Sequence, residues 1–411
     1  MLAPGRVAAL LGDFSRSPAF RGLADGLRTL IAEGRVPVGA RLPSERDLTR
    51  ALGVSRTTVT RAYDLLREER YLTSRQGSGS VTRLPVSLVG RTDHLLGVAD
   101  APDGDRIDLT IATPMPPPGL LAAYERAAAR FGSYAAGTGY YPTGVPALLE
   151  ALAERYSARG LPTTPDQLVV VGGALAGLAA VAQVLVRPGD RALVELPTYP
   201  NPITTLRARS ARLVTTPVDP EHGWDVDHAL GAARGARLAY LVPDFHNPTG
   251  ALMGTADRIR LGDGLTRLGV VPVVDESLVD TALDDDPLPL PFATFAPETV
   301  TVGSASKSFW GGLRIGWVRA PRERVAAVRS ARLSLDLASA PFEQLVLLEL
   351  MADEAALRAE RRTSLGASRA AARQAIADLL PDWQLHPARG GLSLWCRLPM
   401  PRSTALAVAA E

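Results

Sequence analysis

The apolar positions of the first 84 residues repeat with a helical period in three places. The first stripe has members three or four residues apart, at Leu23, Leu27, Leu30 and Ile31. A second helix is expected to start at Ser44, with Asp47 completing a capping-box-like pair, and to stop at Gly53. Ser55 then caps a third helix, whose inward-facing residues are Val59, Ala62, Tyr63 and Leu66.

The next stretch, "YLTSRQGSGSVTR", predicts a two-stranded hairpin with Gly77 and Gly79 at its tip. Residues 85–105, "PVSLVGRTDHLLGVADAPDGD", are rich in Pro, Gly and Asp and show no clear periodicity. We therefore expect a linker there, between a small head (residues 16–84) and a large body (residues 106–411).

In the body, valine-rich runs alternate with Ala/Leu helical patterns, which is typical of a mostly parallel α/β sheet. The runs that predict strands are 167–171, 191–196, 237–242, 270–275 and 299–304. Near the end of the chain, "GGLSLWCRLP" predicts one further strand of a smaller domain.

Composition excludes several classes of protein. The 411 residues include one cysteine, Cys396, which rules out an intramolecular disulfide framework and fits the cytoplasm. Residues 168–186 are uncharged, but Gly172 and Gly173 follow a valine run, so a buried strand, a glycine turn and a helix explain them better than a membrane span. No membrane partner and no metal ligands are predicted.

The charge is unevenly distributed along the chain. Residues 1–84 contain 14 arginines and 8 acidic residues, a net charge of +6, whereas the whole chain carries +2. A basic head on a mildly acidic body indicates that the head meets a polyanion. Solvated arginines on a small helical bundle are the alternative.

A helix, a short glycine turn and a second helix have the spacing of a helix-turn-helix, whose second helix enters the major groove of DNA. The candidate DNA contacts are basic, hydroxyl or glycine positions, namely Arg41, Ser44, Ser55, Arg56, Thr57, Thr58, Arg61, Arg75 and Gly77. The stretch "RLPSERDLTRALGVSRTTVTRAYDLL" resembles the core of the winged helix-turn-helix of the GntR regulators. This resemblance covers residues 16–84 and implies double-stranded operator DNA as a partner.

Lys307 is the only lysine, and the other 44 of the 45 basic residues are arginines. A guanidinium stays protonated in proteins, whereas a desolvated lysine can lose its proton and act as a nucleophile. Chance in an arginine-biased composition is the plain alternative.

Residues suited to chemistry stand directly after the predicted strands, at the edge where α/β sheets place their sites. They are Gly173, Ala174, Leu175, Tyr199, Asn247, Asp275, Ser304, Ser306, Lys307 and Arg314. Each has a structural alternative, such as a packing turn, a core tyrosine or a paired carboxylate. Together they supply what pyridoxal phosphate needs: an amine for its aldehyde, donors for its phosphate and a carboxylate for its ring nitrogen.

Residues 106–411 resemble the fold-type I aminotransferases. The resemblance implies that Lys307 forms the Schiff base with pyridoxal 5'-phosphate and that Asp275 holds the pyridine nitrogen. It implies that Asn247 of "NPTG" contacts the phenolic oxygen and that Tyr199 stacks on the ring. The implied phosphate contacts are Gly173, Ala174, Leu175, Ser304, Ser306 and Arg314.

A GntR head on such a body is the arrangement of the MocR-type regulators, which the whole chain resembles. The resemblance implies a transcription regulator that binds pyridoxal phosphate on Lys307 and senses the cofactor or an amine or amino-acid adduct. It also implies a homodimer, because the sites of this fold lie at a subunit interface.

Three departures from the family concern catalysis. "GALAG" lacks the polar side chains usual in the phosphate turn, Ser277 replaces a common tyrosine, and no residue maps to the arginine that grips an α-carboxylate. The family continues beyond the point where this chain stops, so we expect either that the C-terminal part of the body is truncated and the chain is a fragment, or that the substrate end of the pocket has degenerated. We therefore expect regulation rather than efficient turnover. An active pyridoxal-phosphate-dependent aminotransferase with a DNA-binding domain, and a body that is only a dimerisation scaffold, are the alternatives.

Overall fold

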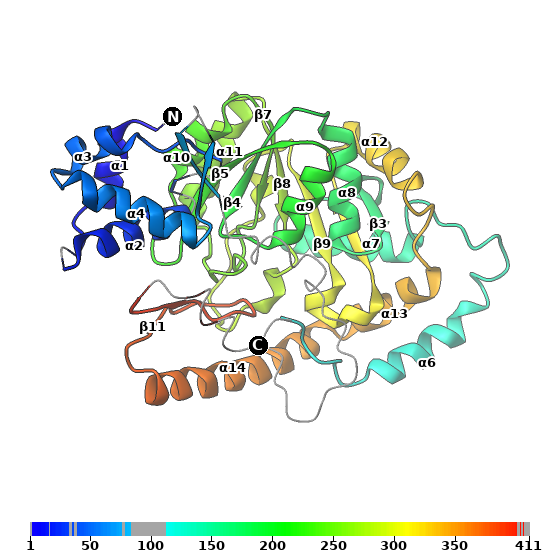
Figure 1. Cartoon of the computed structure of the whole chain (residues 1–411). Coiled ribbons are helices and arrows are strands. Elements are labelled where there is room, and N and C mark those ends of the chain that lie inside the picture. The colour runs from blue at the N-terminus through cyan, green and yellow to red at the C-terminus, as the bar shows by residue number, and fades with distance from the viewer. Residues whose placement is uncertain are drawn as a thin grey trace. The chain divides into compact units, whose positions relative to one another are not determined.

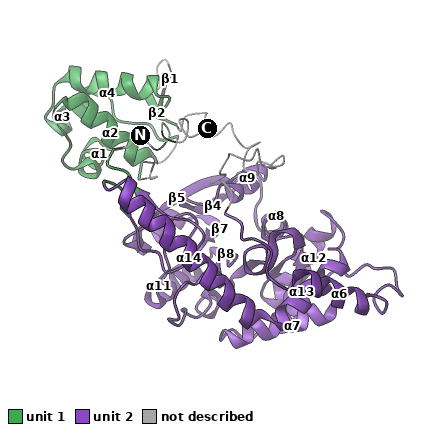
Figure 2. Cartoon of the chain, turned by 90° about the horizontal axis from the view of Figure 1, so that it is seen from below, with its two compact units in different colours: residues 1–111, 382–384, 397–411 green, residues 112–381, 385–396 purple. Residues whose placement is uncertain are grey.

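The computed structural model describes residues 2–15, 17–32, 35–36, 39–75, 79–83 and 112–400, together with 403 and 406. The chain forms two compact units (Figure 2). The first unit comprises residues 1–111, 382–384 and 397–411, and the second comprises 112–381 and 385–396. The expected linker, residues 85–105, lies outside the described residues.

The first unit is helical with one hairpin. Its elements are α1 (Pro4–Leu11), α2 (Ala19–Ala32), α3 (Glu45–Leu52), α4 (Arg56–Glu68), β1 (Leu72–Arg75) and β2 (Gly79–Thr82). The apolar residues that predicted α2 and α4 are buried in one cluster together with Leu48 of α3, and all three predicted helices are present. Helix α1 was not predicted, although its Val7 is fully buried in the same cluster.

Local signals place α3 and α4 as expected. The Ser44 hydroxyl accepts from the Asp47 N–H at 3.2 Å and donates to its carboxylate at 2.7 Å. Gly53 ends α3 with φ 62°, a left-handed conformation that glycine adopts without steric cost. The hydroxyl of Ser55 then caps α4.

An eight-stranded sheet lies at the centre of the second unit (Figure 1). Its strand order is β3-β10-β9-β8-β7-β4-β5-β6. The strands are β3 (Leu168–Val171), β4 (Arg191–Leu196), β5 (Arg212–Asp219), β6 (Gly223–Trp224), β7 (Ala236–Leu241), β8 (Val271–Asp275), β9 (Val300–Ser304) and β10 (Gly316–Arg319). All five predicted strands are present. Strands β5, β4, β7, β8 and β9 are parallel, whereas β10 runs antiparallel to both β3 and β9.

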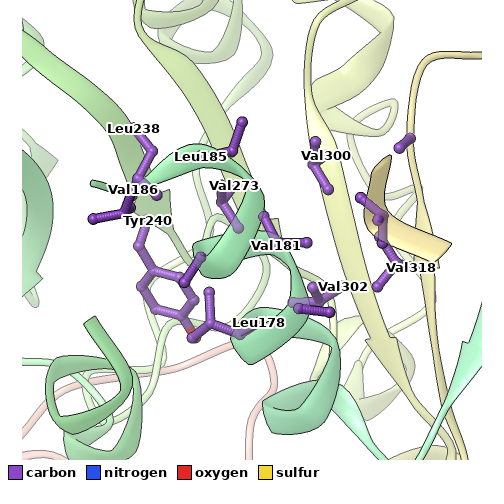
Figure 3. Packing of buried hydrophobic residues seen from close by; sticks show 14 of the residues in the cluster. Leu178, Val181, Leu185, Val186, Leu238, Tyr240, Val273, Val300, Val302 and Val318 are labelled. Atoms are coloured by element: carbon purple, nitrogen blue, oxygen red, sulfur yellow. The ribbon is translucent and has the colours of Figure 1, made fainter. Parts of the chain in front are cut away.

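Helices pack on both faces of this sheet, for example α8 on one and α10 and α11 on the other. The helices of the second unit are α6 (Leu120–Phe131), α7 (Pro146–Ala158), α8 (Ala174–Leu185), α9 (Pro200–Ala208), α10 (Val226–Ala233), α11 (Thr255–Arg267), α12 (Arg322–Leu333), α13 (Pro341–Ala352) and α14 (Glu354–Leu379). Alternate residues of β7 enter different clusters: Leu238 and Tyr240 pack beneath α8 (Figure 3), and Ala239 and Leu241 pack with α10 and α11. A strand buried on both faces reads as the continuous apolar run seen in the sequence.

Residues 168–186 form β3, a glycine turn and α8, as expected, and no described helix is long and apolar enough to cross a membrane. The further strand predicted in "GGLSLWCRLP" is much shorter than expected. Only Cys396–Arg397 is a strand, β12, which forms a two-stranded sheet with β11 (Gln384–Leu385). An apolar run predicts a strand only where a neighbouring backbone continues the ladder, and β11 contributes two residues.

Candidate functional site

Lys307 lies in a π-helical turn, Ser306–Trp310, that follows the end of β9. Its Nζ donates to the Ala112 carbonyl at 2.8 Å and to the Thr113 hydroxyl at 3.2 Å. Burial, and next the positive charge of Arg314, lower the pKa of the amine, while the negative charge of Asp275 acts in the opposite direction. The two charged residues predicted to share the site of Lys307 thus both affect the pKa of its amine.

Asp275 ends β8, and both of its carboxylate oxygens accept hydrogen bonds. The Tyr240 hydroxyl donates to Oδ2 at 2.7 Å, and the Ser277 N–H donates to Oδ1 at 2.8 Å. Tyr240 comes from the neighbouring strand β7 and is 1% exposed. Two donors on different oxygens fix the plane of the carboxylate.

Tyr199 and Asn247 follow β4 and β7. Burial, and next Asp275, raise the pKa of the Tyr199 phenol, while Arg314 opposes this rise. The Tyr199 ring thus lies near the same two charges that act on Lys307, and its hydroxyl accepts from Asn201 Nδ2 at 2.5 Å. Asn247 is half-buried in the segment after β7.

The glycine turn before α8 lies against Arg314. Gly173 caps the helix with φ 105°, and a β-carbon there would lie 3.3 Å from Arg314 Nη2. Arg314 Nη2 also donates to the Gly172 carbonyl at 3.5 Å. Ala174 and Leu175 form the first turn of the helix, and Leu175 is 40% exposed. A β-carbon at position 173 would crowd the guanidinium, and φ 105° disfavours other residues, so glycine lets the helix N-terminus and the arginine lie close together.

The serines around Lys307 have different partners. Ser304 is buried, and its hydroxyl accepts from the Ser306 N–H at 3.1 Å. Ser306 is half-buried, and Ser308 donates to Asp280. Ser306 therefore has the freer hydroxyl of the two predicted phosphate contacts.

Helix α14 holds the backbone of the lysine segment. Arg361 Nη2 donates to the Phe309 carbonyl at 2.7 Å, and its Nη1 donates to the Lys307 carbonyl. Arg358, one turn earlier, pairs with Asp280 at 3.2 Å. These contacts connect α14 to both sides of the π-helical turn.

In the first unit, the predicted recognition residues lie in the first turns of α4. Ser55 Oγ accepts from the Thr58 N–H at 3.1 Å and bonds its hydroxyl at 2.8 Å, so both side chains serve the cap. Arg56 and Thr57 are exposed, and Arg56 pairs with no carboxylate among the described residues. The Arg61 guanidinium lies over the ring of Phe20 in α2, 4.0 Å from its centroid.

The remaining predicted DNA contacts lie at the hairpin and at α3. The backbone of Arg41 forms an isolated antiparallel β-bridge with Val81 of β2. A β-carbon on Gly79 would lie 2.9 Å from Arg41 Nε. Ser44 caps α3, and Arg75 ends β1. Gly77 lies outside the described residues.

The chain matches two family models. Residues 116–410 match the model of aminotransferase class I and II, and residues 21–81 match that of the bacterial regulatory proteins of the gntR family. The chain belongs to the aminotransferase class I and II family and carries a GntR head. It is thus a GntR-type helix-turn-helix transcription regulator of the MocR type, with an aminotransferase-like body.

Curated relatives are similar to this chain over most of its length. An uncharacterised HTH-type transcriptional regulator of Escherichia coli, YdcR, is 28% identical over 408 residues, 93% of this chain and 86% of that protein. The probable rhizopine catabolism regulatory protein MocR of Rhizobium meliloti is 31% identical over 327 residues, 74% of this chain and 66% of that protein.

Solved aminotransferases share the fold of the body. LysN, the α-aminoadipate aminotransferase of Thermus thermophilus, solved with N-(5'-phosphopyridoxyl)-L-leucine, has a TM-score of 0.63 and 27% identity over 71% of this chain and 77% of its own. N-succinyldiaminopimelate aminotransferase of Mycobacterium tuberculosis has a TM-score of 0.61 and 26% identity, and the match covers 67% of this chain and 72% of that chain.

The charges of Asp275 and Arg314 act on both the Lys307 amine and the Tyr199 phenol, and Arg314 lies against Gly173. These residues fit pyridoxal phosphate, because an amine, a fixed carboxylate, an aromatic ring and an arginine at a helix N-terminus meet its functional groups. Tyr240 and Arg361 were not predicted. A tyrosine inside an apolar strand and one of many arginines on a helix give no signal of a role in a site.

Proposed function

We propose that this regulator binds pyridoxal 5'-phosphate covalently on Lys307 and that the bound cofactor, or an amine or amino-acid adduct of it, changes the affinity of the head for operator DNA. The observation that carries the proposal is the environment of the only lysine: its amine has a lowered pKa and lies within reach of Asp275 and Arg314. Burial favours the neutral amine, which is the form that attacks an aldehyde.

The roles of the residues are those that the resemblance implies, and some of their contacts support them. Asp275, fixed by two donors, would accept from the protonated ring nitrogen, and the Tyr199 ring would cover the cofactor. Gly173, Ala174, Leu175, Ser304, Ser306 and Arg314 would hold the phosphate, with Arg314 supplying the charge. Asn247 would donate to the phenolic oxygen. When bound, the cofactor supplies an aldehyde that reacts with amines and a ring that withdraws electrons.

Ala112 and Thr113 support a route from the site toward the head. They are the first described residues after residues 85–111, and they accept from the Lys307 amine. A change at this amine would therefore alter the contacts of Ala112 and Thr113, which stand at the start of the body in the sequence. A ligand shifts such an equilibrium by its differential affinity for the two states, which corresponds to about 5–150-fold in DNA affinity.

The experiment has two parts. Borohydride reduction with pyridoxal phosphate, followed by peptide mapping, should label Lys307. Titration of the upstream DNA of the protein's own gene should then give different affinities with and without cofactor. If Lys307 is labelled but the DNA affinity is the same with and without cofactor, the body binds the cofactor and the sensing part of the proposal is wrong. Rapid conversion of the cofactor to its amine form across an amino-acid panel would instead favour an active aminotransferase.

We further propose that the protein acts in the cytoplasm as a homodimer on double-stranded operator DNA. A dimer would present two heads to two half-sites, as helix-turn-helix proteins do. Sedimentation equilibrium of the full chain should give twice the mass of the 43.5 kDa protomer.

A further inference from the structure

We propose that Tyr240 is a positioning residue for the cofactor: through its hydrogen bond to Asp275 it orients the carboxylate that meets a heteroaromatic ring nitrogen. The inference rests on the proposed function, because it assigns a residue to the same site. Neither the resemblance nor the sequence pattern assigns Tyr240 a role in this site.

The strand register places the two groups in reach of each other. Tyr240 of β7 lies opposite Val273 of β8, and Asp275 is two residues further along the same strand. Residues two apart on a strand face the same side of the sheet and are about 6.6 Å apart along it. The long tyrosine side chain spans this offset, and its hydroxyl meets Asp275 Oδ2 at 2.7 Å.

Packing fixes the ring independently of the hydroxyl. Tyr240 is 1% exposed and lies in the cluster that includes Leu178 of α8 and Val273 (Figure 3). Phenylalanine has the same ring, so it would keep these contacts and lose only the donor. The hydrogen bond can therefore be removed without removing the packing.

The phenol is a permanent donor in this position. Burial, and next the negative charge of Asp275, raise the pKa of Tyr240 well above its ordinary value, so the hydroxyl keeps its proton throughout the working range. A protonated phenol next to a carboxylate can only donate to it. The Tyr240 hydroxyl donates to one oxygen of Asp275 and the Ser277 N–H donates to the other, so the carboxylate has one orientation toward the ligand.

The test compares Tyr240→Phe with Tyr156→Phe in the full chain. Tyr156 is a matched control, because it is 2% exposed and its hydroxyl accepts from Trp317 Nε1 at 3.0 Å. The probes are pyridoxal 5'-phosphate and its 1-deaza analogue, in which a C–H group replaces the ring nitrogen. Affinities are measured by absorbance titration, and thermal unfolding verifies that each variant folds.

Tyr240→Phe should weaken binding of pyridoxal phosphate about tenfold, as expected for a lost hydrogen bond to a charged group. It should change the affinity for the deaza analogue by less than about twofold. Tyr156→Phe should change the affinity for each of the two probes by less than about twofold. A structural role alone would weaken both probes equally. That result, or an unchanged affinity for pyridoxal phosphate, would overturn the inference.

A second comparison applies if the single variant is unstable. Asp275→Asn removes the charge that a missing donor would leave unpaired, so Tyr240→Phe is repeated in that background. The second substitution should then change cofactor affinity by less than about twofold, because its effect passes through the carboxylate. A tenfold loss that persists there would refute the role. If the unmodified protein neither binds the cofactor nor is labelled at Lys307, the proposed function is refuted, and the role of Tyr240 with it.

Discussion

Two opposite charges act on the amine of Lys307 and set how readily it reacts. Arg314 disfavours the ammonium form and Asp275 favours it, and burial adds to the effect of Arg314. Because the pKa is lowered from its ordinary 10.5, the neutral, reactive amine should be present at lower pH than in a free lysine. Arg314→Met should move the midpoint of reactivity to higher pH, and Asp275→Asn should move it to lower pH.

Trinitrobenzenesulfonate is a suitable probe, because Lys307 is the only lysine and peptide mapping separates it from the N-terminal amine. The rate of modification is measured against pH in the three proteins. Arg322→Met removes a guanidinium that is 63% exposed and serves as the control, with an unchanged midpoint. If Arg314→Met left the midpoint of the modification rate against pH unchanged, the charge of Arg314 would not act on the Lys307 amine.

Single residues were predictable where their chemistry was out of place. An isolated lysine, an aspartate at the end of an apolar run and paired glycines after a strand could all be found in the sequence. Tyr240 could not, because its role depends on the parallel register of β7 and β8, which no local pattern encodes.

Among the elements, α14 is unusual in running for 26 residues with Arg361 as its buried residue. Arg361 donates to the carbonyls of Lys307 and Phe309, so Arg361→Met should leave one buried and one half-buried acceptor without this donor. We expect a loss of about 1–3 kcal/mol in the free energy of unfolding, measured by urea titration of tryptophan fluorescence. Arg362→Met, which removes a half-exposed pair with Asp285, should cost less than about 1 kcal/mol. Equal losses would show that α14 does not hold the lysine segment.

Helix α4 supports a prediction about DNA. Arg56 is exposed at the start of the helix and has no carboxylate partner among the described residues, whereas Arg61 is stacked on Phe20. Arg56→Ala should weaken binding to mixed-sequence duplex DNA and reduce the slope of log affinity against log salt by about one. Fluorescence anisotropy at several salt concentrations measures both effects. The body variant Arg322→Ala should leave the slope unchanged, and an unchanged slope in Arg56→Ala would argue against a phosphate contact.

Elements were predictable where one period dominated. The three helices of the head and the five strands of the body follow from spacing and caps, and the structure contains them. Strand β10 was missed because "RIGWVR" is short and follows a glycine-rich segment, and its antiparallel pairing with β3 and β9 is a tertiary choice. Helix α1 was missed because it buries a single residue, Val7.

At the scale of the whole molecule, the two units have separate hydrophobic clusters. The cluster of the first unit shares no residue with the three clusters of the second, so calorimetry should resolve two unfolding transitions. Every residue proposed to hold the cofactor lies in the second unit.

Pyridoxal phosphate should therefore raise the second unit's transition alone. At a concentration about 100 times its Kd the stabilisation is about 2.7 kcal/mol, because a ligand that binds only the folded state stabilises it by mass action. Lys307→Arg keeps the charge but cannot form the covalent link, so most of this shift should disappear. Excised fragments of the first unit would identify its transition in the full scan. If both transitions moved together, the cofactor would act on the stability of the whole chain rather than on the body that contains Lys307.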